Sequence, residues 1–77
     1  MTVVSRIDLG SRELVPHHTE SRCEYQIVAT ENGQKLLQIS TFGSEDRATD
    51  GVKQAIQFTE SALKELRQIL ELSLTAL

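Results

Sequence analysis

Two segments with alternating apolar and polar residues flank the dipeptide Asn32-Gly33 in the middle of the chain. Alternation with a period of two is the pattern of a strand with one buried face. Asn-Gly tolerates a positive φ at both of its positions, which a type I′ hairpin turn requires. The sequence therefore predicts an antiparallel β-hairpin over residues 23–42 with a type I′ turn.

The strand period assigns the side chains of this hairpin to two faces of a sheet. The residues predicted to face the core are Tyr25, Ile27, Ala29, Leu37, Ile39 and Thr41. Residues 43–51 are bounded by glycines and rich in turn formers, which predicts an exposed loop. Residues 52–58 alternate again and are predicted to form a strand beside the second one. The solvent face then carries Gln26, Val28, Gln38, Ser40, Phe42, Lys53, Ala55 and Gln57.

From Thr59 onward the apolar period changes to 3.6, which predicts an amphipathic helix over residues 59–77. Thr59 suits the N-cap, and Glu60 suits the positive end of the helix dipole. Because Leu72 falls on the polar side, the last turn is apolar nearly all round. Those leucines are consistent with a frayed end, a cap on the core or a dimer contact. The predicted dimer interface comprises Leu66, Leu70, Leu72, Leu74 and Leu77.

The first 22 residues are predicted to form one strand, from the alternation over residues 3–9, and a polar linker over residues 16–22. The predicted fold is a single α+β domain, residues 1–77. It consists of an antiparallel four-stranded sheet with a C-terminal amphipathic helix across one face. Within it, residues 1–22 are the N-terminal strand and linker, 23–58 a three-stranded antiparallel meander, and 59–77 the helix.

A chain of 77 residues encloses little core, because folding removes only about 60% of the surface that a chain of this size exposes. The single Cys23 cannot form an internal disulfide, and no Cys/His array indicates a structural metal. Self-association is the remaining way to brace so small a domain. We therefore expect a homo-oligomer, most simply a dimer.

Charge limits the partners that the chain can bind. Eight Lys and Arg against eleven Asp and Glu give a formal charge of -3, and this average field opposes nucleic acid. A nucleic-acid site would therefore have to be local. No leader-like or membrane-spanning apolar segment is evident, so we expect a cytoplasmic protein that does not bind membranes, in keeping with a free thiol.

A metal or catalytic cluster can be drawn from His17, His18, Cys23 and Glu24. The spacing fits no closed tetrahedral site, and adjacent histidines in an extended segment usually point apart. A Cys23–His18 nucleophilic pair lacks an orienting acid. The acidic residues of 44–50 lack the order of an EF-hand loop. We therefore expect no enzyme, no metal, no cofactor and no small-molecule substrate.

The predicted solvent face has the composition of a polar binding surface. Glutamine amides carry donors and acceptors for base edges, and Phe42 could stack on a base. Lys53 and Arg47 could meet phosphates, although so few cations give little electrostatic affinity. The other interpretation is an ordinary solvated face on which the glutamines have no role.

The stretch LLQISTFGSEDRATDGVKQAIQFTESALKELRQIL contains a strand, a polar loop with Arg47, then Gly51 with Lys53, a strand ending at Phe58 and a helix. Over roughly residues 24–70 the chain resembles the single-stranded-DNA-binding domain of the positive-cofactor-four transcriptional coactivators. It also looks like a group of short bacterial proteins of uncertain role. The coactivator resemblance implies a dimer formed partly through the C-terminal helices, with single strands lying across curved sheets. By that resemblance the nucleic-acid contacts would be Lys35, Phe42, Arg47 and Lys53.

The expected function is that of a small non-enzymatic module that binds single-stranded nucleic acid weakly through the sheet face of a homodimer. The predicted binding residues are Lys35, Gln38, Phe42, Arg47, Lys53 and Gln57. The alternative is a protein-interaction module that docks a partner through the leucine-rich end of the helix.

Overall fold

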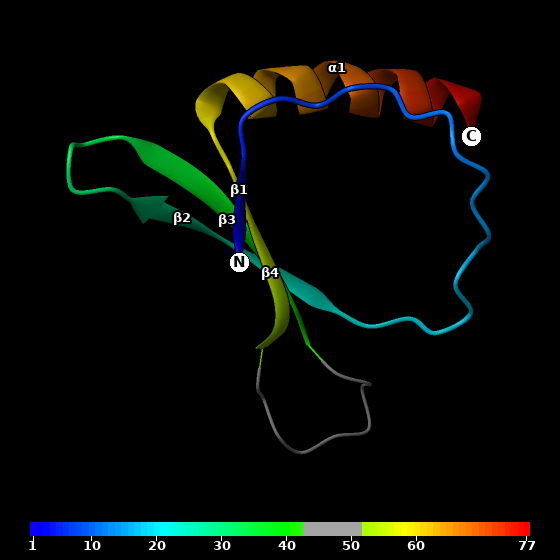
Figure 1. Ribbon diagram of the computed structural model, residues 1–77, viewed down its shortest axis with the longest axis horizontal. Coiled ribbons are helices and arrows are strands. Elements are labelled where there is room, and N and C mark those ends of the chain that lie inside the picture. Colours follow the sequence, from blue (N-terminus) through cyan, green and yellow to red (C-terminus); the bar gives the residue numbers. More distant parts are fainter. Residues whose placement is uncertain (43–51) are drawn as a thin grey trace.

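The computed structural model describes residues 1–42 and 52–77, without the side chains of Val52 and Lys53. The elements in chain order are β1 (Thr2–Val4), β2 (Cys23–Ala29), β3 (Lys35–Phe42), β4 (Val52–Phe58) and α1 (Glu60–Ala76) (Figure 1). The strands form one sheet in the order β1-β4-β3-β2. The α+β class and the order of elements are confirmed, whereas the loop predicted for 43–51 lies outside the described residues.

Strands β2 and β3 form the predicted hairpin, but the predicted type I′ turn is wrong. Gly33 has a φ of 84°, and no described non-glycine residue has a positive φ. The loop between Thr30 and Gln34 therefore contains three residues, of which Gly33 alone is left-handed. Thr30 N donates to Gln34 O at 2.7 Å, and Thr30 Oγ1 accepts from Gln34 N at 3.0 Å. Both bonds stabilise the longer loop.

Strand β4 pairs antiparallel with β3, as predicted, so the meander over β2, β3 and β4 is confirmed. The pairing shifts between Thr41 and Phe42, where the register departs from regular alternation. Up to that point the registers of the three strands agree. The two faces predicted from strand parity are therefore the two faces of the sheet.

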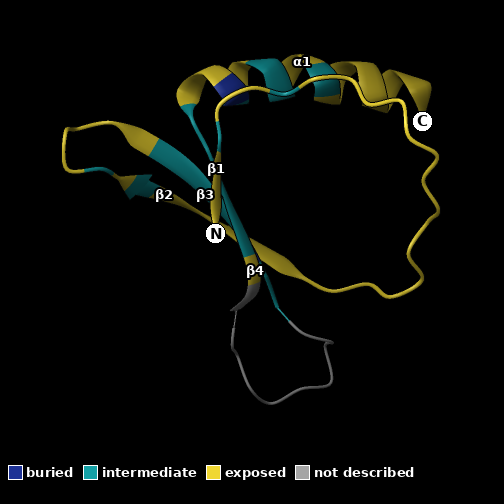
Figure 2. Ribbon diagram, in the orientation of Figure 1, coloured by how far each residue is buried: buried dark blue, intermediate teal, exposed yellow. Residues whose placement is uncertain are grey.

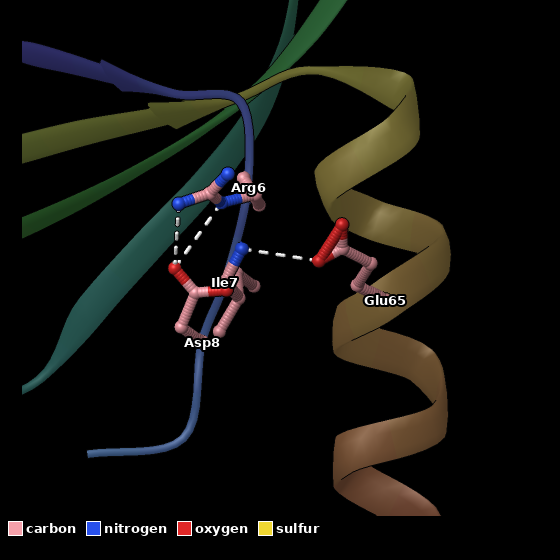
Figure 3. Close-up of polar contacts among 4 residues, drawn as sticks. All are labelled: Arg6, Ile7, Asp8 and Glu65. Atoms are coloured by element: carbon pink, nitrogen blue, oxygen red, sulfur yellow. Dashed lines mark hydrogen bonds and ion pairs between the residues drawn. The ribbon is translucent and has the colours of Figure 1, made fainter.

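The predicted all-antiparallel sheet is wrong, because β1 runs parallel to β4. Both strands end at the same end of the sheet, where Thr59 N donates to Val4 O at 3.0 Å. The chain then continues beside α1: Ser61 Oγ donates to Ser5 O at 3.3 Å, and Ile7 N donates to Glu65 Oε2 at 3.0 Å (Figure 3). These contacts favour the parallel direction, and residues 5–22 return the chain to the start of β2 (Figure 1).

Helix α1 begins where it was predicted to begin. Thr59 is the N-cap, and its hydroxyl accepts from Ala62 N at 3.2 Å. The helix does not lie across one face of the sheet as predicted. It contacts β3 near its start and then runs beyond the end of the sheet (Figure 1). Every residue from Leu70 to Leu77 is exposed.

The chain buries very little on its own (Figure 2). Within the described residues, Ala62 is the buried apolar residue, at 0% exposure, and Ser40 is the buried polar one. Two residues predicted to face the core, Tyr25 and Ile27, are 77% and 63% exposed. They are exposed because the helix that was expected to cover them points elsewhere.

Candidate functional site

Three glutamines lie side by side across the sheet, one on each strand of the meander. Gln38 on β3 is paired in register with Gln26 on β2 and with Gln57 on β4. Gln57 Nε2 donates to Gln38 Oε1 at 2.8 Å, and Gln38 Nε2 donates to Ser40 Oγ at 3.0 Å. We call Gln26, Gln38 and Gln57 the glutamine row. They share what we call the polar face with Glu24, Ser40 and Phe42.

The glutamine row retains hydrogen-bonding capacity for a ligand. A glutamine amide has two N–H donors and an oxygen with two acceptor sites. The two bonds above use one donor of Gln57 and one donor and one acceptor site of Gln38. Gln26 is exposed. The row therefore presents both donors and acceptors at the surface of the sheet.

A guanidinium group lies against an aromatic ring at one end of the polar face. Arg22 Cζ is 4.4 Å from the centroid of the Phe42 ring, and Arg22 Nη1 donates to Glu24 Oε2 at 2.7 Å. Phe42 N also donates to Arg22 O at 3.4 Å. Arg22 thus occupies one side of the ring that was expected to stack on a base. Guanidinium planes stack on bases as aromatic rings do.

Sequence reasoning missed Arg22 as a site residue, because the predicted turn gives a different register. A two-residue turn at Asn32-Gly33 would pair Cys23 with Phe42, whereas the observed three-residue loop pairs Cys23 with Thr41. The next residues outward, Arg22 and Phe42, therefore lie opposite each other. The ion pair with Glu24 is half exposed, and such pairs contribute at most about 1 kcal/mol. The ion pair leaves this corner of the polar face nearly neutral. Amides and stacking groups, rather than net charge, are therefore what this corner offers a ligand.

The predicted nucleic-acid residues do not all lie together. Gln38, Phe42 and Gln57 lie on the polar face. Lys35 is exposed at the start of β3 and alternates with them, so it belongs to the opposite face. Arg47 and the side chain of Lys53 lie outside the described part of the structure.

The opposite face, which we call the apolar face, consists of two rows that run across the same three strands. In one row Ile39 pairs with Tyr25 and Ile56, and in the other Leu37 pairs with Ile27 and Phe58. An open hollow lies beside the first row, lined partly by Met1 and Thr2. The apolar face is therefore continuous and incompletely covered.

The leucines of the predicted dimer interface fall into two groups. Leu66, Leu70, Leu74 and Leu77 are three or four residues apart, so they form one stripe along α1. We call these four residues the leucine stripe. Leu66 is half-buried, while Leu70, Leu74 and Leu77 are 51%, 72% and 98% exposed. Leu72 is also 72% exposed but lies on the other side of the helix.

The histidine pair is arranged differently from the prediction. The rings of His17 and His18 do not point apart but stack, with centroids 5.3 Å apart and planes within 5°. Thr19 N donates to His17 Nδ1 at 3.2 Å, and Cys23 is exposed. Within the described residues no three His, Cys, Asp or Glu side chains come together as a possible metal site.

Comparison of the chain with protein-family models, with curated proteins and with solved structures finds no match. Among the described residues no helix has the length and apolarity needed to span a membrane. The candidate functions therefore depend on the polar face and the leucines of α1 alone.

Proposed function

We propose that this protein is a non-enzymatic module that binds single-stranded nucleic acid through the polar face, acting as a homodimer. The glutamine row is the observation that carries the proposal, since Gln57 and Gln38 are linked at 2.8 Å and still present amide groups outward. The Arg22–Phe42 pair adds a flat stacking group on the same face. A strand face that only contacts solvent would need neither the glutamine row nor the Arg22–Phe42 pair.

A single strand fits this chemistry better than a duplex. Unpaired bases expose their hydrogen-bonding edges and flat faces, and those are the groups that amides and guanidinium planes recognise. Neighbouring strands lie about 4.8 Å apart, so the glutamine row spans about 10 Å. Stacked bases rise about 3.4 Å per nucleotide, so the row can meet about three of them.

The charge distribution sets the strength and salt dependence of this binding. The chain carries a formal charge of -3, and the Arg22 charge is paired with Glu24. Few phosphates can then be neutralised, and each contributes only about 0.7 to the slope of log affinity against log salt. We expect weak binding with a shallow salt dependence, and a dimer doubles the binding surface.

Fluorescence anisotropy with labelled oligo-dT at low salt tests the proposal. The double variant Gln38→Ala/Gln57→Ala should weaken binding about tenfold, since each hydrogen bond contributes about 1 kcal/mol or less. Gln68→Ala is the matched control, because Gln68 is an exposed glutamine on α1. Absence of binding at about tens of micromolar protein, where non-specific binding is already typical, would overturn the proposal. Equal losses for the double variant and the control would also overturn it.

The stacking part of the site has its own variant. Arg22→Lys keeps the positive charge and removes the planar guanidinium. If Arg22 stacks on a base, this variant should weaken oligo-dT binding at every salt concentration by a similar factor. A loss confined to low salt would show that the charge alone matters.

The exposed leucines of α1 support a second candidate, a protein-interaction module that docks a foreign partner. Sedimentation velocity separates the two candidates. A monomer in solution leaves the leucines available to another protein and favours docking. A tight dimer that covers them favours the first proposal.

A further inference from the structure

The isolated chain exposes more surface than a folded protein of its mass should. Its accessible area is 7093 Å², whereas a compact monomer of 8.6 kDa exposes about 4,700 Å². Its radius of gyration is 14.6 Å, against about 11.5 Å for a compact domain of this length. The surplus is about 2,400 Å², to which the fully exposed residues 8–22 contribute, and one subunit of an obligate homodimer buries about 1,000 Å² or more.

Among the described strands and helix, two apolar surfaces lie uncovered. The first is the apolar face, whose edge residues Tyr25 and Ile27 are 77% and 63% exposed. The second is the leucine stripe, which carries Leu74 and Leu77 at 72% and 98% exposure. The helix has no basic residue in its last turn, although a cation there would favour a solvated helix end. Both surfaces are suited to burial.

The helix cannot cover the apolar face of its own chain. Thr59 is the single residue between β4 and α1, so the connection has no slack. The bond from Ile7 N to Glu65 Oε2 (Figure 3) and the bond from Thr59 N to Val4 O hold the first turns against the N-terminal segment. Folding the helix back over the sheet would break these contacts. Helix α1 of the same chain is therefore excluded as the cover for the apolar face.

We propose that the apolar face of each chain is covered by the leucine stripe of a second copy, so that two chains exchange their helices around a twofold axis. Such an interface is self-complementary, because each chain supplies one sheet face and one stripe. At 1.5 Å per residue the stripe from Leu66 to Leu77 is about 16 Å long. The two apolar rows lie two residues apart along the strands, about 7 Å, so the stripe can cross both rows.

This arrangement leaves the polar face of each chain outward, since the two sets of side chains alternate along the same strands. The interface does not depend on nucleic-acid binding. Helix exchange also removes Leu72 from the predicted interface, because Leu72 lies on the far side of the helix from the stripe. In helix exchange Leu72 stays exposed to solvent, whereas a helix end that is buried all round would bury Leu72 as well.

Leu72 and Leu74 provide a matched pair for testing the stripe, because both are 72% exposed in the single chain. Leu74→Asp should raise the dimer dissociation constant about a hundredfold or more, since the change occurs twice in a twofold interface. Leu72→Asp should change it less than about threefold. Sedimentation equilibrium measures both, and circular dichroism checks that the helix is retained. Equal effects of the two variants would contradict the proposal, and so would a monomeric wild-type chain.

Cross-linking tests which surfaces meet, using substitutions too mild to remove the fold. In a Cys23→Ser background, Ile27→Cys marks the apolar face and Leu74→Cys marks the stripe. The two proteins are unfolded and refolded together, then treated with a short bismaleimide. Helix exchange predicts linked dimers in the mixture and none in either protein alone. Linkage of the Leu74→Cys protein with itself would show helix against helix and overturn the proposal. Self-linkage of the Ile27→Cys protein would overturn it as well, and so would no linkage at all.

Discussion

The polar and the apolar faces of the sheet belong to the same three strands, yet their side chains are satisfied to different degrees. On the polar face Gln57 bonds to Gln38, Gln38 bonds to Ser40, and Arg22 lies on Phe42. On the apolar face Tyr25 and Ile27 remain mostly exposed. Polar groups can complete their bonds within one layer, whereas apolar groups need a second layer. The described residues of the single chain supply an incomplete second layer over the apolar face.

The largest effect is expected where a charge is placed on the apolar face. Ile27→Asp should lower the free energy of unfolding by about 3 kcal/mol or more, because a carboxylate would be buried without a partner under helix α1 of the second copy. Gln26→Asp, at the adjacent position of β2 and on the polar face, should cost less than about 0.5 kcal/mol. Chemical denaturation at two protein concentrations measures both values.

The concentration dependence belongs to the same prediction. If a second copy covers the apolar face, the unfolding midpoint of the wild type rises with protein concentration, and dilution brings it toward that of Ile27→Asp. Equal losses for Ile27→Asp and Gln26→Asp would mean that water covers both faces alike. The contrast between the faces would then have no energetic meaning.

A smaller effect is expected at the turn that sets the register between β2 and β3. Gly33→Ala should cost about 1 to 2 kcal/mol, because an L-residue at a φ of 84° is strained. An added Cβ would meet no atom within 4 Å, so the cost comes from the backbone alone. Gly10→Ala is the control, with equal space and no positive φ, and thermal unfolding should show little change. A one-residue slip of β2 against β3 would turn the side chains of one strand to the opposite face of the sheet. A smaller loss of stability in Gly33→Ala would indicate that the separation of the two faces does not depend on this turn.

The smallest effect is expected at the helix cap, which directs α1 away from the apolar face. Thr59→Ala removes the acceptor for Ala62 N and should cost about 1 kcal/mol. Thr75→Ala near the other end of α1 should be neutral or slightly stabilising, since alanine is the better helix former. Denaturation curves compare the two. If both variants behave alike, the cap does not determine where the helix begins.

Much of this architecture could be predicted from the sequence, because strand and helix periods record which side of each element is apolar. Alternation over residues 23–42 and 52–58 correctly separated Gln38 and Gln57 from Leu37 and Ile39. Thr59 was recognisable as an N-cap because its hydroxyl precedes the first helical turn. These features are local and are written within a few neighbouring residues.

The features that sequence reasoning missed depend on distant parts of the chain. The direction of β1 follows from contacts between Val4 and Thr59 and between Ile7 and Glu65, and no periodicity encodes such pairs. Asn-Gly suits two-residue and three-residue loops alike, so the turn type depended on Thr30. Alternation shows which face is apolar, but it does not show what covers that face.

The pairing of β1 with β4 has a consequence for the order in which the sheet assembles. Thr2 pairs with Ile56, which is distant in the sequence, whereas the hairpin pairs residues that are near one another. Contacts that close a long loop form later than local ones. The hairpin can therefore form before β1 joins the sheet, and β1 stays unpaired until β4 and the first turn of α1 are in place. Strand β1 is then among the last elements to join the sheet.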